Sequence, residues 1–199
     1  GKGTQSEMFS KNGYHVISTG DLLRDQVRLK TKLGLNIKKI MADGKLVSDE
    51  IIMDLICIEL NKSIKFKGII FDGFPRNINQ ARKLKKIIKI NFVIDIDTPI
   101  DLIMKRIEGR YLCSNCGKSY NKYFNKPEMQ GICDVCKGQN FEKRIDDNSR
   151  TINNRIKQHI KDSKNIIKFY KKDNIYFKVD GSKTSDITHQ EINLIIKKN

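Results

Sequence analysis

An acid, a sharp turn and an arginine follow one another directly at Asp72-Gly73-Phe74-Pro75-Arg76. An apolar run at residues 66–71 precedes them and predicts a strand buried on both faces, and a Lys-rich helical pattern follows them. Because open α/β sheets bind ligands beyond the carboxyl ends of their strands, these residues are candidates for a phosphate or metal site. A guanidinium suits a phosphate, and a carboxylate suits metal-bound water. The alternative is an ordinary turn with a surface salt bridge, and this stretch alone does not decide between the two.

Four cysteines form the strongest isolated motif, as Cys113-x2-Cys116 and Cys133-x2-Cys136. Two thiolate pairs on tight turns complete a tetrahedral Zn²⁺ site with no open position, which predicts a structural rather than a catalytic metal. The surrounding residues, about 110–147, are polar and turn-rich, so we expect the metal to supply the stability of this segment. Disulfides are the less favoured alternative, because no secretory signal is visible.

The first four residues, Gly1-Lys2-Gly3-Thr4, match the end of a phosphate-binding loop at a helix N-terminus. In such a loop backbone N–H groups and the lysine hold phosphates, and the threonine hydroxyl lies beside Mg²⁺. Four residues are a weak motif by themselves. Because the strand and glycines that would precede them are absent, we expect this sequence to be a fragment of a longer chain, or to be inactive.

Single cations next to turns and helix ends recur along the chain. They are Lys2, Arg24, Arg76, Arg106, Arg110, Arg144 and Arg155. Phosphoryl transfer requires such an array, because its catalysis rests on positioning and on stabilising the charge of the transferred group. No nucleophile–base pair accompanies them, and the three histidines have no obvious partners in the sequence.

Strand and helix patterns alternate, which predicts parallel β-α units. Strands are expected at 14–17, 66–71, 92–97 and 175–179, and helices at 2–11, 21–30, 33–42, 49–61, 77–88, 99–108, 149–171 and 186–197. Helix caps are expected at Thr19, Ser48 and Thr98. Cys57 and Ile58 are expected on the buried face of the helix at 49–61.

The chain is strongly basic, with a net charge of +16 from 39 Lys and Arg against 23 Asp and Glu. Such a balance fits a polyanionic partner, but the lysines are spread in runs along the whole sequence, which favours a solvated surface over one nucleic-acid stripe. No apolar run has the length of a membrane span.

Taken together, these motifs resemble those of the adenylate kinases over nearly the whole chain. The matching segments are Gly1-Lys2-Gly3-Thr4, Ser18-Thr19-Gly20-Asp21-Leu22-Leu23-Arg24, Asp72 to Arg76 with Gln80, Arg106-Ile107-Glu108-Gly109-Arg110, Arg144-Ile145-Asp146-Asp147 with Arg155, and Asp180-Gly181-Ser182-Lys183. The four cysteines match the long, zinc-bearing form of the lid in that family.

The resemblance implies an α/β P-loop nucleoside monophosphate kinase fold, with a parallel sheet flanked by helices, an AMP-binding helical insert and a zinc-bearing lid. The core would comprise residues 1–17, 48–108 and 148–199, the insert residues 18–47 and the lid residues 109–147. The implied reaction is reversible phosphoryl transfer from ATP to AMP, giving two ADP, with Mg²⁺. Closure of both inserts would exclude water from the transfer.

The resemblance also implies roles for individual residues. ATP would be bound by Gly1, Lys2, Gly3, Thr4, Arg106, Arg110, Ser119, Tyr120 and Lys183. AMP would be bound by Thr19, Arg24, Lys45, Leu46, Val47, Gly73, Phe74, Pro75, Arg76, Gln80, Arg144 and Arg155. Catalysis would rest on Lys2, Arg76, Arg106, Arg110, Arg144 and Arg155. Zinc would be held by Cys113, Cys116, Cys133 and Cys136, and Mg²⁺ would lie, through water, near Thr4 and Asp72.

We expect a cytoplasmic monomer that binds ATP, AMP and ADP, without a membrane or nucleic-acid partner; organellar targeting stays open because the N-terminus is absent. One alternative is a zinc-ribbon nucleic-acid-binding protein with Tyr120, Tyr123 and Phe124 as stacking aromatics. A ribbon alone does not account for Asp72 to Arg76 or for the arginines outside it. The other alternative is a sister kinase with GTP as donor or UMP or CMP as acceptor.

Overall fold

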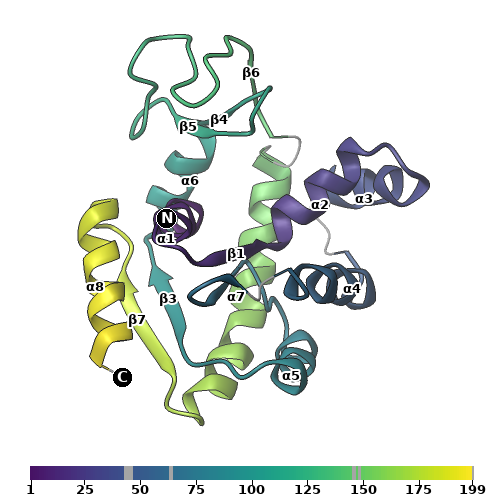
Figure 1. Cartoon of the computed structure of the whole chain (residues 1–199), viewed down its shortest axis with the longest axis vertical. Helices are drawn as coiled ribbons and strands as arrows, with labels where there is room; N and C mark the ends of the chain where they lie inside the picture. The colour runs from purple at the N-terminus through teal and green to yellow at the C-terminus, as the bar shows by residue number, and fades with distance from the viewer. Residues whose placement is uncertain (43–46, 63–64, 145–146, 148, 199) are drawn as a thin grey trace.

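The computed structural model describes residues 1–199 except 43–46, 63–64, 145–146, 148 and 199, and it leaves out the side chains of 149–151, 153 and 155. Within the described residues, helices and strands alternate along the chain (Figure 1). The helices are α1 (Lys2–Lys11), α2 (Thr19–Arg28), α3 (Lys32–Ala42), α4 (Asp49–Leu60), α5 (Ile78–Ile87), α6 (Ile100–Glu108), α7 (Ser149–Lys171) and α8 (Ser185–Lys198). The strands are β1 (His15–Ser18), β2 (Ile69–Asp72), β3 (Val93–Asp97), β4 (Arg110–Cys113), β5 (Ser119–Asn121), β6 (Phe141–Glu142) and β7 (Tyr176–Asp180).

Two parallel strand pairs lie at the centre of the molecule, so the predicted α/β class is confirmed. Strand β1 pairs with β2, ending in the register Ser18 to Asp72, and β3 pairs with β7, ending in the register Asp97 to Asp180. Both pairs therefore end in polar side chains at their carboxyl ends, which is the edge where parallel sheets bind ligands.

The prediction of a strand at 66–71 buried on both faces was wrong in its start and in its burial. Strand β2 begins at Ile69, and all its residues are only half-buried. Phe66 lies before the strand, 45% exposed, with its ring stacked on that of His15 at 4.7 Å between centroids. Phe66 makes this contact with the first residue of β1 from outside β2, so its apolar character does not require a place in the strand.

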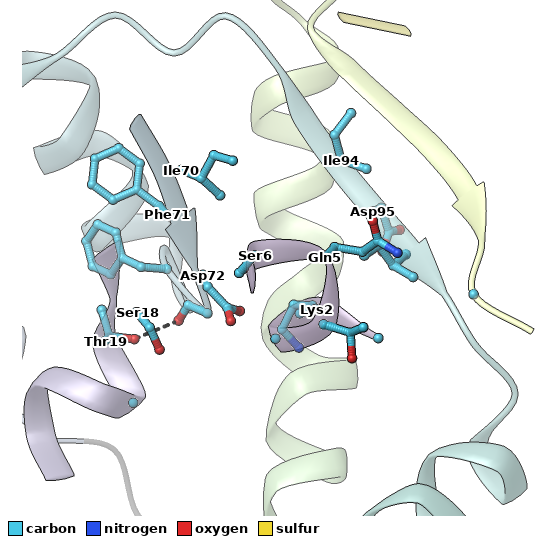
Figure 2. Close-up of a pocket in the computed structure, with 18 of the residues that line it drawn as sticks. Lys2, Gln5, Ser6, Ser18, Thr19, Ile70, Phe71, Asp72, Ile94 and Asp95 are labelled. Atoms are coloured by element: carbon cyan, nitrogen blue, oxygen red, sulfur yellow. Dashed lines mark hydrogen bonds between the residues drawn. The ribbon is translucent and has the colours of Figure 1, made fainter. Parts of the chain in front are cut away.

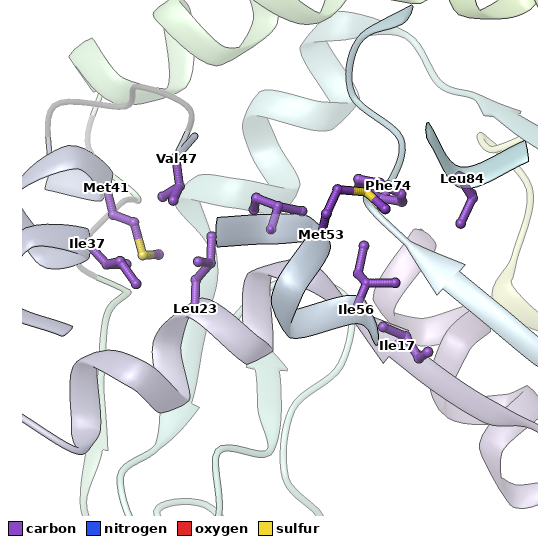
Figure 3. Close-up of a cluster of buried hydrophobic side chains, with 10 residues drawn as sticks. Ile17, Leu23, Ile37, Met41, Val47, Met53, Ile56, Phe74 and Leu84 are labelled. Carbon is purple, nitrogen blue, oxygen red and sulfur yellow. The ribbon is translucent and has the colours of Figure 1, made fainter. Parts of the chain in front are cut away.

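The larger hydrophobic core lies among α2, α3, α4, α5 and β1 (Figure 3). Ile17, Ile37 and Ile56 are almost completely buried there. Phe74, from the turn after β2, is also part of this core, and its peptide bond to Pro75 is cis. The turn that carries the candidate ligand residues is thus anchored by apolar packing.

A second core joins α1 and α8 to both strand pairs. Phe9, Val179 and Ile192 are buried in it, and Ile70 of β2 and Ile94 of β3 pack against them. This core determines where the N-terminal end of α1 lies relative to the ends of the strands.

The segment with the four cysteines forms a small antiparallel sheet in the order β5-β4-β6, which stands above the rest of the molecule in Figure 1. Its interior consists of Cys113, Tyr120 and Cys133, with Tyr111 and Phe141 packed against them. Such a core is too small to fold by apolar burial alone, as the sequence indicated.

Some local expectations need correction. Ser18, not Thr19, caps α2, because its side chain accepts from the Asp21 amide. Pro99 occupies the N-cap of α6, where no side-chain cap bond forms. Cys57 is exposed and Ile58 is 55% exposed, because both lie on the side of α4 turned away from Ile56. The Ser48 cap of α4 is confirmed by its bond to the Ile51 amide.

Among the described residues, no helix has both the length and the apolar character that crossing a membrane requires.

Candidate active site

A large cleft lies between the two strand pairs and continues under the cysteine-bearing segment. In Figure 2, Asp72 of β2 and Asp95 of β3 flank it, with Lys2, Gln5 and Ser6 of α1 between them. The site residues expected from the sequence that line this cleft are Gly1, Lys2, Gly3, Thr4, Thr19, Arg24, Val47, Asp72, Gly73, Phe74, Pro75, Arg76, Gln80, Arg106, Arg110, Ser119, Tyr120, Arg144 and Lys183. Of the remainder, Lys45 and Leu46 lie outside the described residues, and Arg155 lies in α7 with its side chain not described.

The turn after β2 is organised by the carbonyl of Gly73. This carbonyl accepts hydrogen bonds from Arg76 Nε at 2.8 Å and from Thr19 Oγ1 at 3.2 Å; Figure 2 draws the second. Gly73 has φ of +73°, and a Cβ there would lie 3.2 Å from Arg76 Nη2, so glycine suits the position in both respects. Thr19 of α2 and Arg76 of the turn are thereby held next to each other in the cleft.

Gln80 fixes the other side of this turn and is only 2% exposed. Its Oε1 accepts from the backbone N–H of Arg76 at 2.7 Å, and its Nε2 donates to Asp49 Oδ1 at 2.7 Å. The side chain of Asn77 caps α5. Its Oδ1 accepts from the backbone N–H of Gln80 at 2.9 Å, and its Nδ2 donates to the same Asp49 oxygen. The orientation of the Gln80 side-chain amide follows from this network, and within the described part of the chain its second N–H has no hydrogen-bond partner.

Helix α1 presents its N-terminal end to the cleft, with no acidic residue in its first turn. Such an end attracts anions through its unpaired N–H groups and its dipole. Gln5, in the first turns of α1, is 4% exposed and joins α1 to α8. Its Nε2 donates to the Ser185 carbonyl at 2.7 Å, and its Oε1 accepts from His189 Nδ1 at 3.0 Å. The sequence carried no signal for this contact, because its two ends are 184 residues apart.

Three arginines from distant segments gather at one end of the cleft: Arg24, Arg110 and Arg144. Arg110 makes a two-point ion pair with Asp147, through Nε at 2.7 Å and Nη2 at 2.5 Å, and Arg24 pairs with Asp21 at 2.6 Å. Burial, followed by the charges of Arg110 and Arg24, lowers the pKa of Arg144 to about 10. Its Nε is buried and has no hydrogen-bond partner among the residues that the structure describes. This cluster therefore suits an anion that brings several oxygens.

Arg106 reaches the loop after β7 by donating from Nη1 to the Gly181 carbonyl at 2.9 Å. Burial lowers the pKa of its guanidinium. A Cβ on Gly181 would lie 2.0 Å from Thr98 Oγ1, so only glycine permits this approach of the two segments. The Lys183 side chain points away toward α8, where Nζ pairs with Glu191 at 2.5 Å.

The four cysteine sulfurs lie within 4.8 Å of one another. The Cys113–Cys136 and Cys116–Cys133 sulfur pairs are each 3.5 Å apart, close to the roughly 3.8 Å edge of a tetrahedron with Zn–S bonds of about 2.3 Å. Burial alone would raise the pKa of Cys133, but the Tyr120 hydroxyl and nearby backbone N–H groups lower it to about 6. The geometry and the donor set both fit a structural zinc ion.

Tyr120 belongs to the interior of this segment. It is 1% exposed, its hydroxyl donates to Cys133 Sγ at 3.4 Å, and it accepts from the Asp134 amide at 2.8 Å. The Tyr120 side chain is therefore not available to a ligand in the cleft. At this position only the Tyr120 backbone and the neighbouring Ser119 could contact one.

Contacts with α1 and α2 help to hold the cysteine-bearing segment against the body of the protein. Lys118 Nζ pairs with Glu7 Oε1 of α1 at 2.5 Å, and Gly117 lies beside Arg28 of α2. Burial would raise the pKa of Glu7, but Lys118 and then Lys11 lower it below its ordinary value. The segment thus covers the cleft in this structure.

The structure supplies surroundings for the histidines that the sequence left without partners. His189 bonds to Gln5, and His15 Nε2 lies 3.6 Å from Glu59 Oε2. His159 lines the cleft.

Comparison with known proteins agrees with this geometry. The family model described as "Adenylate kinase" matches residues 1–175. A protein named adenylate kinase from Novosphingobium aromaticivorans is 39% identical over 202 residues, which is 98% of this chain and 94% of that protein. The protein of the same name from Enterococcus faecalis is 37% identical over 100% of this chain and 95% of its own length. That from Staphylococcus aureus strain Mu50 is 39% identical over 98% of this chain and 94% of its own length.

Proposed function

This chain belongs to the adenylate kinase family, and from that premise we propose that it transfers the terminal phosphoryl group of ATP reversibly to AMP, giving two ADP. As a member of that family it is a nucleoside monophosphate kinase. The observation that carries the proposal is the cluster of Arg24, Arg110 and Arg144 beside the cleft that also holds Lys2 and Arg76. Cations on both sides of one cleft suit two phosphate chains that meet end to end.

On the donor side, Lys2 and the backbone of Gly1, Gly3 and Thr4 would hold the ATP phosphates. Arg106, which already contacts the loop at Gly181, would lie between the phosphates and the base. Further donor contacts are proposed for Arg110, for Ser119 and the backbone of Tyr120, and for the backbone of Lys183. The outward direction of the Lys183 side chain supports this backbone role.

On the acceptor side, Thr19 and Arg76 meet at the Gly73 carbonyl, and Gln80 is oriented by Asp49. We propose that Arg76 binds the AMP phosphate and that the remaining Gln80 N–H reads the base. The other proposed acceptor residues are Arg24, Lys45, Leu46, Val47, Phe74, Pro75, Arg144 and Arg155, of which Val47 and Phe74 are buried around the pocket.

No general base is required, because the acceptor is a phosphate oxygen that is already anionic. The transfer requires the two phosphates in line and cations around the moving group, which Lys2, Arg76, Arg110 and Arg144 would supply. Mg²⁺ would arrive with the nucleotide and reduce the charge on its oxygens. Thr4 and Asp72 line the cleft and carry the oxygen atoms that suit its water shell.

We further propose three moving parts: a core of residues 1–17, 48–108 and 148–199, an acceptor insert of 18–47 and a lid of 109–147. The lid begins next to Arg110 and ends at Asp147, and the ion pair between these two residues supports a hinge there. Closure would remove water that otherwise competes for the phosphoryl group.

A coupled assay with ATP, GTP, CTP and UTP as donors and the four monophosphates as acceptors tests the proposal. The highest kcat/KM is expected for ATP with AMP. A preference for GTP as donor, or for UMP or CMP as acceptor, would replace this assignment by a sister kinase. Binding of single-stranded oligonucleotide without any phosphoryl transfer would instead favour a nucleic-acid role for the zinc segment.

Gln80→Leu should raise KM for AMP about tenfold and leave KM for ATP within about twofold of the wild-type value. The change removes the only group we assign to the acceptor base edge and leaves the Arg76 amide without its acceptor. Initial rates with each substrate varied at saturation of the other measure the two constants. Gln190→Leu, at an exposed position of α8 outside the cleft, is the matched control. An equal rise in both KM values would show that Gln80 does not distinguish the two sites.

Breaking the Lys118–Glu7 ion pair should weaken lid closure. Glu7→Gln and Lys118→Met are each expected to raise KM for ATP about two- to fourfold at low salt, and the difference from wild type should vanish near 1 M salt. Because the pKa of Glu7 is lowered, its carboxylate should stay charged and the contact should persist at neutral pH. The contact should be lost only as pH falls through this lowered pKa.

Lys11→Met is the control for this pair, since Lys11 contacts the same carboxylate at 3.4 Å from within α1 and does not join the lid. It should leave the salt dependence of KM unchanged. If the double variant Glu7→Gln, Lys118→Met shows the sum of the two single effects, the ion pair does not contribute to closure.

A further inference from the structure

Asp49 contacts the side-chain amide of Gln80 from outside the cleft. It lies in the first turn of α4, which is next to α5 in Figure 1, and it is not among the described residues that line the cleft. One of its oxygens, Oδ1, accepts hydrogen bonds from Gln80 Nε2 at 2.7 Å and from Asn77 Nδ2 at 3.0 Å. Because an ionised carboxylate oxygen only accepts, the Gln80 atom that faces it must be the nitrogen.

A donor fixes the other end of the same amide. Gln80 Oε1 accepts from the backbone N–H of Arg76 at 2.7 Å. An amide keeps nearly the same shape after a half-turn about its last bond, so packing by itself does not select between its two orientations. Here the half-turn would place the amide oxygen against the Asp49 carboxylate and the NH₂ group against the Arg76 N–H. Since Gln80 is only 2% exposed, water does not replace the lost bonds.

The selected orientation determines what Gln80 offers to a ligand in the cleft. One N–H of Nε2 and one lone pair of Oε1 remain after the bonds to Asp49 and Arg76. This pair complements a base edge with an acceptor nitrogen next to an amino group, which is the N1 and N6 edge of adenine. In hypoxanthine N1 carries a hydrogen and position 6 is a carbonyl oxygen, so both positions are reversed. Only the rotated amide would fit that base.

Resting on the proposed function, we propose that Asp49 is a positioning residue that determines acceptor specificity. It holds the Gln80 amide in the orientation that fits a 6-aminopurine monophosphate and excludes the orientation that fits a 6-oxopurine. To accept inosine monophosphate (IMP), the wild-type protein must give up the contacts of Gln80 with both Asp49 and Arg76, which leaves buried polar groups unpaired. Without the Asp49 carboxylate, only the contact with Arg76 opposes the rotation.

Initial rates with AMP and with IMP as acceptor, at saturating ATP, test the proposal. Asp49→Leu should lower the ratio of kcat/KM for AMP to kcat/KM for IMP by about tenfold or more, because a charge-assisted hydrogen bond no longer holds the amide. The ratio does not depend on the fraction of active protein, and Asp49→Ala serves if the leucine variant does not fold. An equal loss for both acceptors would show a merely structural role and overturn the proposal.

Two further variants separate the acceptor oxygen from other effects of the change. Asp49→Asn keeps an oxygen that can accept from the same two donors, so its ratio should stay within about threefold of the wild-type value. A ratio as low as that of Asp49→Leu would overturn the proposal. Glu50→Leu is the matched control, because Glu50 lies in the same turn of α4 and also contacts α5, through Lys83 at 3.6 Å. It should leave the ratio unchanged.

Failure of this inference is distinguishable from failure of the proposed function. If the wild-type protein transfers no phosphoryl group to AMP, the proposed function fails and this inference fails with it. If the wild-type protein uses AMP, but its ratio is near one or does not respond to Asp49→Leu, only the inference fails.

Discussion

Arg144→Met should lower kcat/KM by about a hundredfold or more and at the same time raise the thermal midpoint of unfolding. Arg144 lies near the cations of Arg110 and Arg24. Burial, followed by these two charges, lowers its pKa to about 10. A group held among like charges destabilises the free protein. Burying a charge costs several kcal/mol of desolvation unless a partner offsets it, so removing a cation that two like charges also repel should stabilise the free protein.

The loss of activity has a different origin. The transferred phosphoryl group spreads charge over its oxygens, and removing one aligned donor from such a site costs about 10²–10³ in rate. The rise in Tm should be roughly 2–4 °C, which for a chain of this size corresponds to about 1 kcal/mol. A lower kcat/KM together with a higher Tm would identify Arg144 as a residue that binds the ligand and does not stabilise the fold.

Steady-state kinetics and calorimetric unfolding measure the two effects. Arg82→Met is the matched control, because Arg82 is exposed on α5 outside the cleft; it should change neither quantity appreciably. A fall of both Tm and activity in Arg144→Met would mean that the attraction of the Asp147 and Asp21 charges outweighs the repulsion, and that Arg144 is a structural residue.

Removing the zinc ion that we expect at the four cysteines should unfold the proposed lid and leave the rest of the protein folded. Cys133→Ser, or removal of the metal by a chelator, should lower Tm by more than about 5 °C and kcat/KM by about tenfold or more. Outside the cysteines, the lid interior consists of Tyr111, Tyr120 and Phe141, too few apolar groups to hold three short strands. Without the lid, Ser119 and Lys118 no longer lie at the cleft, and the donor phosphates lose their orientation.

Cys57→Ser is the control for this experiment, because Cys57 is exposed on α4 and far in sequence from the lid. It should leave Tm, activity and metal content unchanged. Metal analysis of the wild-type protein should give about one equivalent of zinc, and less than roughly half an equivalent would contradict the assignment. A Cys133→Ser variant that keeps wild-type Tm would show that the lid folds without the metal.

Local features of the sequence were sufficient for most helices and strands. Helix α7 was expected at 149–171 and occurs at those residues, and Ser48 caps α4 as predicted. Helix caps and apolar periodicity act over one or two turns, so the information lies in neighbouring residues. The two Cys-x2-Cys turns are local in the same sense, and their spacing already implied the metal site that the sulfur positions now fit.

The faces of the elements were less predictable. Cys57 and Ile58 were expected in the core and are exposed. The burial of the Tyr120 ring against Cys133 was not expected from the sequence, although Tyr120 lines the cleft as predicted. A broad apolar run on a helix does not say which of its sides meets the rest of the protein. That choice depends on the elements that pack against it, which come from other parts of the chain.

By itself, the sequence predicted the fold class, the segment whose four cysteines could hold a metal and, through its resemblance, a set of site residues most of which line one cleft. Only the tertiary structure decided which of them lie together. Thr19 and Arg76 both donate to the Gly73 carbonyl, and Arg144 lies close enough to Arg24 and Arg110 for their charges to lower its pKa. Glu7 and Lys118 are 111 residues apart, and Gln5 and His189 are 184 apart. No local pattern encodes such pairs, because they form only when distant elements pack together. The position of Asp49 beside Gln80 was decided in the same way.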